Sequence, residues 1–216
     1  MTAPGFAGVP ERALDFYDDL EADNSKAFWS EHRTTYDEAV RAPMLALAER
    51  LAPEFGDAVL FRPHRDVRFS KDKSPYKTHQ GAFVGTADGV GLYVQVSAAG
   101  LLTAGGWHPR GEQVRRYREA VAGPTGAELD RLVRGLERAG FRIEGDRLAT
   151  RPRGQPPGHP REPLLRHKSL TAAREHGSPG WLHGPEAAEK VAADWRTLGP
   201  LVAWLAAHVG PGEPAS

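Results

Sequence analysis

The 216-residue chain has no cysteine, which excludes disulfide bonds, thiolate metal sites and a cysteine nucleophile. No run approaches the roughly 20 apolar residues of a membrane span. The first residues, 1–5, lack the basic and apolar regions of a signal peptide. Neither sign of charge is in excess, because 28 Lys and Arg balance 28 Asp and Glu and the isoelectric point is about 7.2. We therefore expect a cytoplasmic protein without membrane contact, and the neutral charge argues against binding to duplex nucleic acid.

Several widespread catalytic and cofactor motifs are also absent. The sequence has no G-x-x-x-x-G-K-[ST] phosphate loop, no G-x-G-x-x-G after a strand, no G-x-S-x-G elbow and no H-E-x-x-H helix. Its nine histidines are scattered without the spacing of metal ligands. We predict no metal and no cofactor.

The composition is that of a globular protein, with 40% hydrophobic and 26% charged residues. The length is enough for one well-buried core. We expect a single α+β domain over residues 1–216, with its ordered core at about 8–209. A Pro- and Gly-rich stretch predicts a loop at about 151–163, and residues 210–216 are expected to form a flexible tail.

Apolar residues spaced three and four apart predict N-terminal helices over residues 10–52. Pro43 interrupts this pattern and predicts a kink or two consecutive helices. Further helices are predicted at about 110–121 and 125–139, and a C-terminal helical region at 185–209. Within that region, Pro200 predicts a break or the first turn of a last helix.

Alternating and apolar runs predict a central antiparallel sheet, a meander with the helices packed on one side. Strands are expected at 59–61, 81–85, 90–97 and 101–105, and the dipeptide Asp88-Gly89 is typical of a hairpin turn. Val67 and Phe69 alternate with polar residues, which fits either a second strand or an extended loop. Residues 141–149 predict a second small hairpin around Gly145-Asp146.

The most charged stretch is 62–78, with six basic residues against two acidic ones. One cationic segment in a neutral protein predicts a local site for an anion. Guanidinium groups bind phosphate or carboxylate oxygens as forks. In an extended chain Asp66, Arg68 and Ser70 share one face, so we expect a buried Asp66 to orient a neighbouring arginine. The predicted ligand-binding residues in this stretch are Arg62, Arg65, Asp66, Arg68, Lys73, Tyr76 and Lys77.

Aromatic and proton-transferring residues complete the predicted site. Trp107, Tyr76 and Phe69 are candidates for stacking on a ligand. His64, His108, Tyr76 and Asp66 are candidates for catalysis, should the protein be an enzyme, because they can move a proton or orient a group that does.

The central stretch also carries a family resemblance. Arg62, Arg65-Asp66, Arg68-Phe69, Lys73 and Pro75-Tyr76 match R-x-x-R-D-x-R-F-x-x-x-K-x-P-Y position for position. This resembles the motif of DUF2461, a bacterial family of about this length with no assigned function. Residues 24–36, the run Gly-Gly-Trp-His-Pro at 105–109 and the run Leu-Leu-Arg-His-Lys at 164–168 are similar to further family elements.

The resemblance covers roughly residues 8–205 and implies a compact α+β protein without assigned activity. Arg166 and Lys168 join the predicted ligand site on the family's Leu-Leu-Arg-x-Lys element. Pro152-Arg153-Gly154 fits a Pro-Lys-Gly-like element with Arg in place of Lys, which leaves that edge of a site open.

Two functions fit the basic stretch. The first is binding of a small phosphorylated or carboxylated molecule, with or without catalysis; a pocket with aromatic walls would favour it. The alternative is a non-catalytic interaction module that docks an acidic protein or single-stranded nucleic acid; an exposed, flat motif would favour it. The sequence indicates no oligomeric state.

Overall fold

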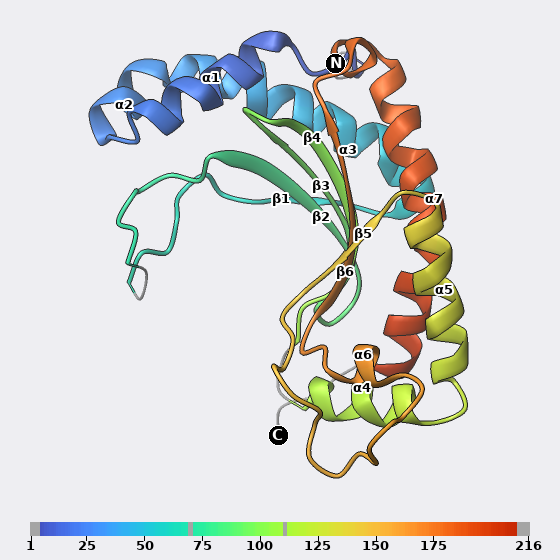
Figure 1. Ribbon diagram of the computed structural model, residues 1–216. Helices are drawn as coiled ribbons and strands as arrows, with labels where there is room; N and C mark the ends of the chain where they lie inside the picture. The colour runs from blue at the N-terminus through green and yellow to red at the C-terminus, as the bar shows by residue number, and fades with distance from the viewer. Residues whose placement is uncertain (1–4, 69–70, 110–111, 211–216) are drawn as a thin grey trace, which may run out of the picture. The chain divides into compact units, whose positions relative to one another are not determined.

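A computed structural model of the chain describes residues 5–68, 71–109 and 112–210 (Figure 1). These residues form helices and a six-stranded antiparallel sheet, so the predicted α+β class is confirmed. Within the described ranges no helix is both long and apolar enough to cross a membrane. The elements in chain order are α1 (Glu11–Ala22), α2 (Lys26–Thr35), the π-helical turn η1 (Tyr36–Arg41), α3 (Ala42–Phe55), β1 (Val59–Leu60), β2 (His79–Ala87), β3 (Val90–Ser97), β4 (Gly100–Trp107), α4 (Gln113–Ala122), α5 (Gly126–Arg138), β5 (Arg142–Glu144), α6 (Glu162–Leu165), β6 (Leu170–Gly177), the 3₁₀ turn η2 (Gly180–His183) and α7 (Glu186–His208).

The sheet has the strand order β1-β2-β3-β4-β6-β5. Strands β2, β3 and β4 follow one another as the predicted meander. Asp88 and Gly89 form the predicted turn between β2 and β3. Gly89 has φ +69°, a left-handed conformation that glycine adopts without steric cost.

The hairpin expected at 141–149 is wrong. Strand β5 pairs antiparallel with β6 instead, with Ile143 opposite Ala172. The residues after the turn follow a different partner, because the Leu148 amide donates to the Arg166 carbonyl (2.7 Å). An isolated two-stranded hairpin is marginal in water, whereas the longer strand β6, which is also paired with β4, offers β5 a stable neighbour.

The N-terminal helical region confirms the prediction of consecutive helices around Pro43. The turn η1 lies directly before α3, and the Ala42 amide donates to the Asp37 carbonyl five residues back. Proline lacks an N–H and its ring crowds the carbonyl four residues earlier, so the α-helical pattern is interrupted here. The wider π-helical turn η1 lies directly before Pro43, whose nitrogen cannot donate a hydrogen bond to the α-helical pattern.

The break expected at Pro200 is absent, because α7 continues through it. Pro200 is exposed, while Leu198, Leu201 and Val202 around it are buried. Burial of these side chains on both sides of the proline offsets the one backbone hydrogen bond that it removes.

The residues group into two compact units, and the expectation of a single domain stays a prediction. The first unit comprises 1–84, 93–103 and 175–193, and the second comprises 85–92, 104–174 and 194–216. In the first, Phe16, Trp29 and Tyr36 form an aromatic core with centroid distances of 4.8–5.9 Å. In the second, the buried Trp107 ring stacks on Tyr117 at 5.0 Å.

Two glycines at the end of β4 lie where neighbouring residues leave no room for a side chain. A Cβ on Gly105 would lie 3.1–3.2 Å from Val202, Leu198 and Leu92. A Cβ on Gly106 would lie 2.6 Å from Thr171 Cα. A side chain at either position would therefore push apart elements of the second unit.

Candidate functional site

The basic stretch forms a loop that leaves β1 and returns to β2 through a paired stem. The Lys77 amide donates to the Pro63 carbonyl (2.8 Å), and the Arg65 amide donates to the Pro75 carbonyl (2.9 Å). We call residues 63–65 and 75–77 the stem, and residues 66–74 the basic loop. No strand forms among the described residues of the basic loop, which favours the extended-loop alternative. The predictions for Phe69 and Ser70 lie outside the described residues.

The stem is fixed to the turn between α1 and α2. The side-chain amide of Asn24 donates to the Tyr76 carbonyl, and its oxygen accepts from the Tyr76 amide, both at 3.1 Å. Asn24 thus replaces the neighbouring strand that Tyr76 lacks on that side. The buried Tyr76 ring stacks on Trp29 with centroids 4.2 Å apart and planes 9° apart. Trp29, itself buried, therefore packs directly against a residue of the motif.

A buried glutamine in β2, next to the stem, links the end of β1 to η1. Gln80 donates through its side-chain nitrogen to the carbonyls of Phe61 (2.8 Å) and Gly81 (3.0 Å). Its oxygen accepts from the Tyr36 hydroxyl (2.6 Å). Neither Asn24 nor Gln80 is predicted as a site residue from the sequence, because no local pattern shows partners that lie so far along the chain.

Most charges of the basic loop pair within it. Asp66 and Arg68 form a fork, with Nε–Oδ1 at 2.9 Å and Nη2–Oδ2 at 2.6 Å. Arg65 pairs with Asp72, and Lys73 donates to the Val67 carbonyl (2.9 Å). Asp66 thus orients an arginine as expected. The expectation that it is buried is wrong, since its side chain is 45% exposed and that of Arg68 77%.

Hydrogen bonds hold the loop's carboxylates in their ionised form. The Ser74 hydroxyl and amide, followed by Arg65, lower the pKa of Asp72 from 3.8 to about 2. The side chain and amide of Arg68 lower the pKa of Asp66. Arg65 and Arg68 are therefore neutralised largely by acids of their own loop.

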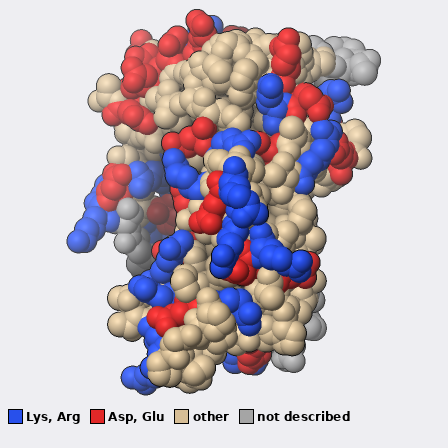
Figure 2. Space-filling view, turned by 45° about the vertical axis from the view of Figure 1, so that its right-hand side comes forward, with Lys and Arg blue, Asp and Glu red and all other residues tan. Residues whose placement is uncertain are grey.

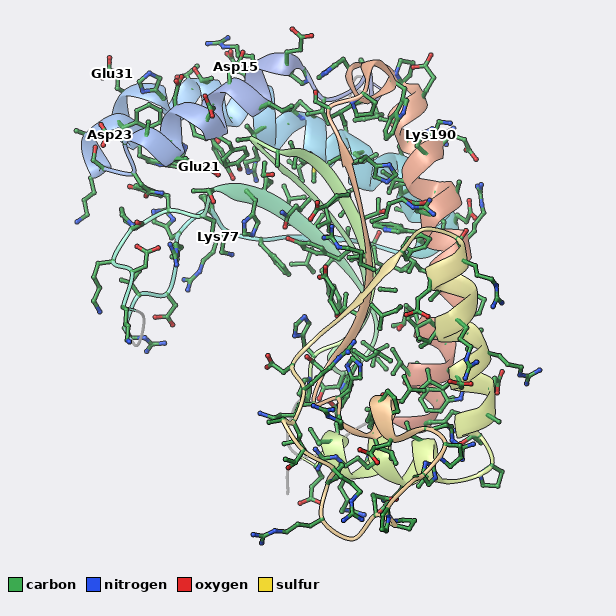
Figure 3. All side chains as sticks on the ribbon, viewed as in Figure 1. Asp15, Glu21, Asp23, Glu31, Lys77 and Lys190 are labelled. Atoms are coloured by element: carbon green, nitrogen blue, oxygen red, sulfur yellow. The ribbon has the colours of Figure 1, made fainter. Side chains whose placement is uncertain are left out.

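The base of the loop is different, because the charged groups that shift the pKa values of Lys77 and His79 are all basic. Burial and then Arg62 lower the pKa of Lys77. Burial, then Lys77 and Arg65, lower the pKa of His79. The Lys77 ammonium lies 5.2 Å from the Phe61 ring centroid, where the loop joins β2 (Figure 3). Within the described part of the chain, no carboxylate forms an ion pair with Arg62 or Lys77. We call Arg62, Lys77 and His79 the basal cluster.

Comparison with known proteins gives a family match. A family model described as a conserved hypothetical protein (DUF2461) matches residues 12–204, most of the chain. The chain belongs to the DUF2461 family. No curated protein and no solved structure matches it.

Four predicted site residues of this DUF2461 protein belong to the second unit. Trp107 is buried, and its indole donates to Gln113 (3.0 Å). Arg166 donates to the carbonyls of Leu148 (2.9 Å) and Ala149 (2.7 Å). His108 and Lys168 are exposed. We leave the four out of the candidate site, and their contact with a ligand stays a prediction.

The predicted catalytic roles in the first unit also stay predictions. His64 is exposed and lies opposite Tyr76 in the stem, and Asp66 is engaged by Arg68. Among the described residues, no three histidine or acidic side chains gather as metal ligands would. On the face drawn in Figure 2, basic and acidic side chains are interspersed, so a basic cluster without acids is a local feature.

Proposed function

We propose that this DUF2461 protein binds a small anionic ligand, bearing a phosphate or carboxylate group, at the basal cluster. The observation that carries the proposal is the gathering of Arg62, Lys77 and His79 without a paired carboxylate among the described residues. Bringing like charges together and burying them in part costs free energy, as the lowered pKa values show. A bound anion removes that cost.

The three side chains suit an oxygen-rich anion. Arg62 offers a planar fork, and Lys77 offers a compact charge beside the Phe61 ring. His79, whose pKa is lowered, would take up a proton as an anion approaches. Gln80 and Tyr36 hold the adjoining backbone in place, which limits the entropy lost on binding. The proposal is one of binding and assigns no reaction.

Docking of an acidic protein or single-stranded nucleic acid by the basic loop is the second candidate. It is favoured by the exposure of the loop, in which Arg68, Lys71 and Lys73 all face solvent. It is disfavoured by the loop's internal pairs, because an acidic partner would have to displace Asp66 and Asp72. The basal cluster needs no such displacement.

A thermal-shift assay tests the proposal, with inorganic pyrophosphate and citrate as probes at low and at physiological salt. A ligand that binds only the native state stabilises it by about 2.7 kcal/mol when its free concentration is about 100 times Kd. For a protein of this size that corresponds to roughly 5–10 °C in Tm. We expect this shift in the wild type and its loss in Arg62→Gln and Lys77→Gln.

Lys71→Gln is the matched control. It removes the same charge from the exposed part of the loop and should leave the shift intact. If all three variants lose the shift equally, general charge explains the binding, and if neither probe shifts the wild type, the proposal is wrong.

A further inference from the structure

Strand β1 lies at one edge of the sheet, and among the described residues no strand other than β2 pairs with it. Val59 is opposite Phe83 and Leu60 opposite Ala82, and the Phe61 amide donates to the Gly81 carbonyl (2.9 Å). Bonded and non-bonded residues alternate along an antiparallel pair. Since Phe61 is bonded to β2, the N–H and C=O of Leu60 point away from it. An open edge of this kind is a template for another strand.

The edge continues beyond β1 into the stem. Pro63 and Arg65 bond across to Lys77 and Pro75, so the same alternation turns the backbone of His64 outward. Phe61, Pro63 and Arg65 are bonded to the chain opposite, so the backbone groups of Leu60 and His64 face outward on either side of a bend at Pro63. The edge is thus longer than the two residues of β1.

The side chains along this edge have a distinct pattern. Among the large hydrophobic side chains of the described residues, Val59 and Phe61 are the exposed ones, at 64% and 37%. The alternation of an extended chain places them on one face and Arg62 on the other. The Phe61 ring is held beside Phe83 and Tyr93, with centroids at 6.5 and 6.0 Å. Exposed apolar side chains on an open edge are a liability unless a partner covers them.

We propose that the edge formed by residues 59–65 docks an extended segment of a partner protein that alternates apolar and acidic side chains. The segment adds to the sheet as a further strand beside β1. Its apolar side chains cover Val59 and Phe61, and its acidic side chains meet Arg62. A second copy of this chain is a poor occupant, because edge-to-edge pairing would bring the same cations together. The proposal goes beyond the anion site, with which it shares Arg62 and the Phe61 ring.

Fluorescence polarisation with a short labelled peptide that alternates valine and glutamate tests this docking on the full-length protein. We expect the peptide to bind, and its counterpart with lysine in place of glutamate not to bind. In Leu60→Pro the outward N–H is lost while the bond between Phe61 and Gly81 is untouched. Binding should weaken roughly tenfold, because a buried carbonyl of the peptide is left without a donor. The variant should keep its thermal shift with pyrophosphate, which shows that the basal cluster is intact.

Amide hydrogen exchange on the unaltered protein gives a second measurement that needs no variant. The peptide should slow exchange at Leu60 and leave Phe61, already bonded to Gly81, unchanged. Equal binding of both peptides, no binding of either, or no protection at Leu60 overturns the proposal. If pyrophosphate still shifts Tm in that case, the edge proposal fails alone and the anion site stands.

Discussion

Asp72 is the residue that holds the basic loop to its stem. Its Oδ1 accepts from the Ser74 amide (2.9 Å) and hydroxyl (2.6 Å), and its Oδ2 pairs with Arg65. Each contact favours the carboxylate over the acid, which is why its pKa is lowered to about 2. A carboxyl with a lowered folded pKa stabilises the fold above its unfolded value and loses that effect as pH falls through the folded one. For Asp72 this window extends from 3.8 down to about 2.

The largest cause of the Asp72 shift can be removed at a single residue. In Ser74→Ala the hydroxyl bond is lost, so the pKa of Asp72 should rise toward 3.8, as an NMR titration of its carboxyl carbon would show. Asp66, which bonds Arg68 rather than Ser74, should titrate at the same pH in both proteins. An unchanged Asp72 titration would mean that the amide of residue 74 and Arg65, not the Ser74 hydroxyl, set its pKa.

At the scale of elements, the turn between α1 and α2 positions the stem. Asn24 supplies both a donor and an acceptor to Tyr76, as a neighbouring strand would. Removing Asn24 should cost more free energy than the net contribution of its two hydrogen bonds, because the N–H and C=O of Tyr76 would be left desolvated without partners. The order of the stem therefore depends on a residue in another element.

Replacing Asn24 tests that dependence. Asn24→Ala removes both bonds and should destabilise the stem locally by about 1–3 kcal/mol. The Tyr76 amide should then exchange with solvent faster, and proteases should cut the basic loop more readily. Asn24→Asp keeps the acceptor and loses the donor, so its effect should be smaller. An unchanged Tyr76 exchange rate in Asn24→Ala would show that the order of the stem does not depend on Asn24.

Elements with a strong local pattern were predictable, and elements defined by their neighbours were not. Strand β3 alternates apolar and polar residues, and β4 contains an apolar run. Both patterns are more typical of strands than of helices or loops. Strand β6 has only one β-branched residue, Thr171, and two buried alanines, Ala172 and Ala173. Its strand character depends on its place between β4 and β5, where the side-chain-free Gly106 leaves room for its backbone. The hairpin expected at 141–149 is wrong for the same reason. Its first strand, β5, pairs with β6, which the local sequence does not mark as a strand.

At the scale of the whole molecule, two glycines differ in what surrounds them. Gly106→Ala places a Cβ against Leu170 and Thr171 and should lower the free energy of unfolding by about 1–3 kcal/mol. A Cβ on Gly135, inside α5, would meet nothing within 4 Å, so Gly135→Ala should raise the free energy of unfolding by about 0.5–1 kcal/mol. Urea unfolding measures both. Equal effects of the two substitutions would mean that the spacing at Gly106 is not tight.

The sequence showed the region of the candidate site but not its arrangement. Charge density alone marked residues 62–78, and Asp66 was correctly given an arginine to orient. Asp72 and Asp66 neutralise Arg65 and Arg68. This leaves Arg62 and Lys77 to act with His79. Which charges pair depends on how the loop folds back. The charge composition of a segment does not show which acidic side chain pairs with which basic one.

The paired stem also makes the basic loop separable from the rest of the fold. Pro63 with Lys77 and Arg65 with Pro75 close the chain before the loop begins, so β1 and β2 do not depend on its length. Each doubling of an enclosed flexible segment adds only about 0.6 kcal/mol of closure entropy. The protein is in this respect a ready scaffold, because a foreign peptide placed between Asp66 and Ser74 would be displayed from a fixed base.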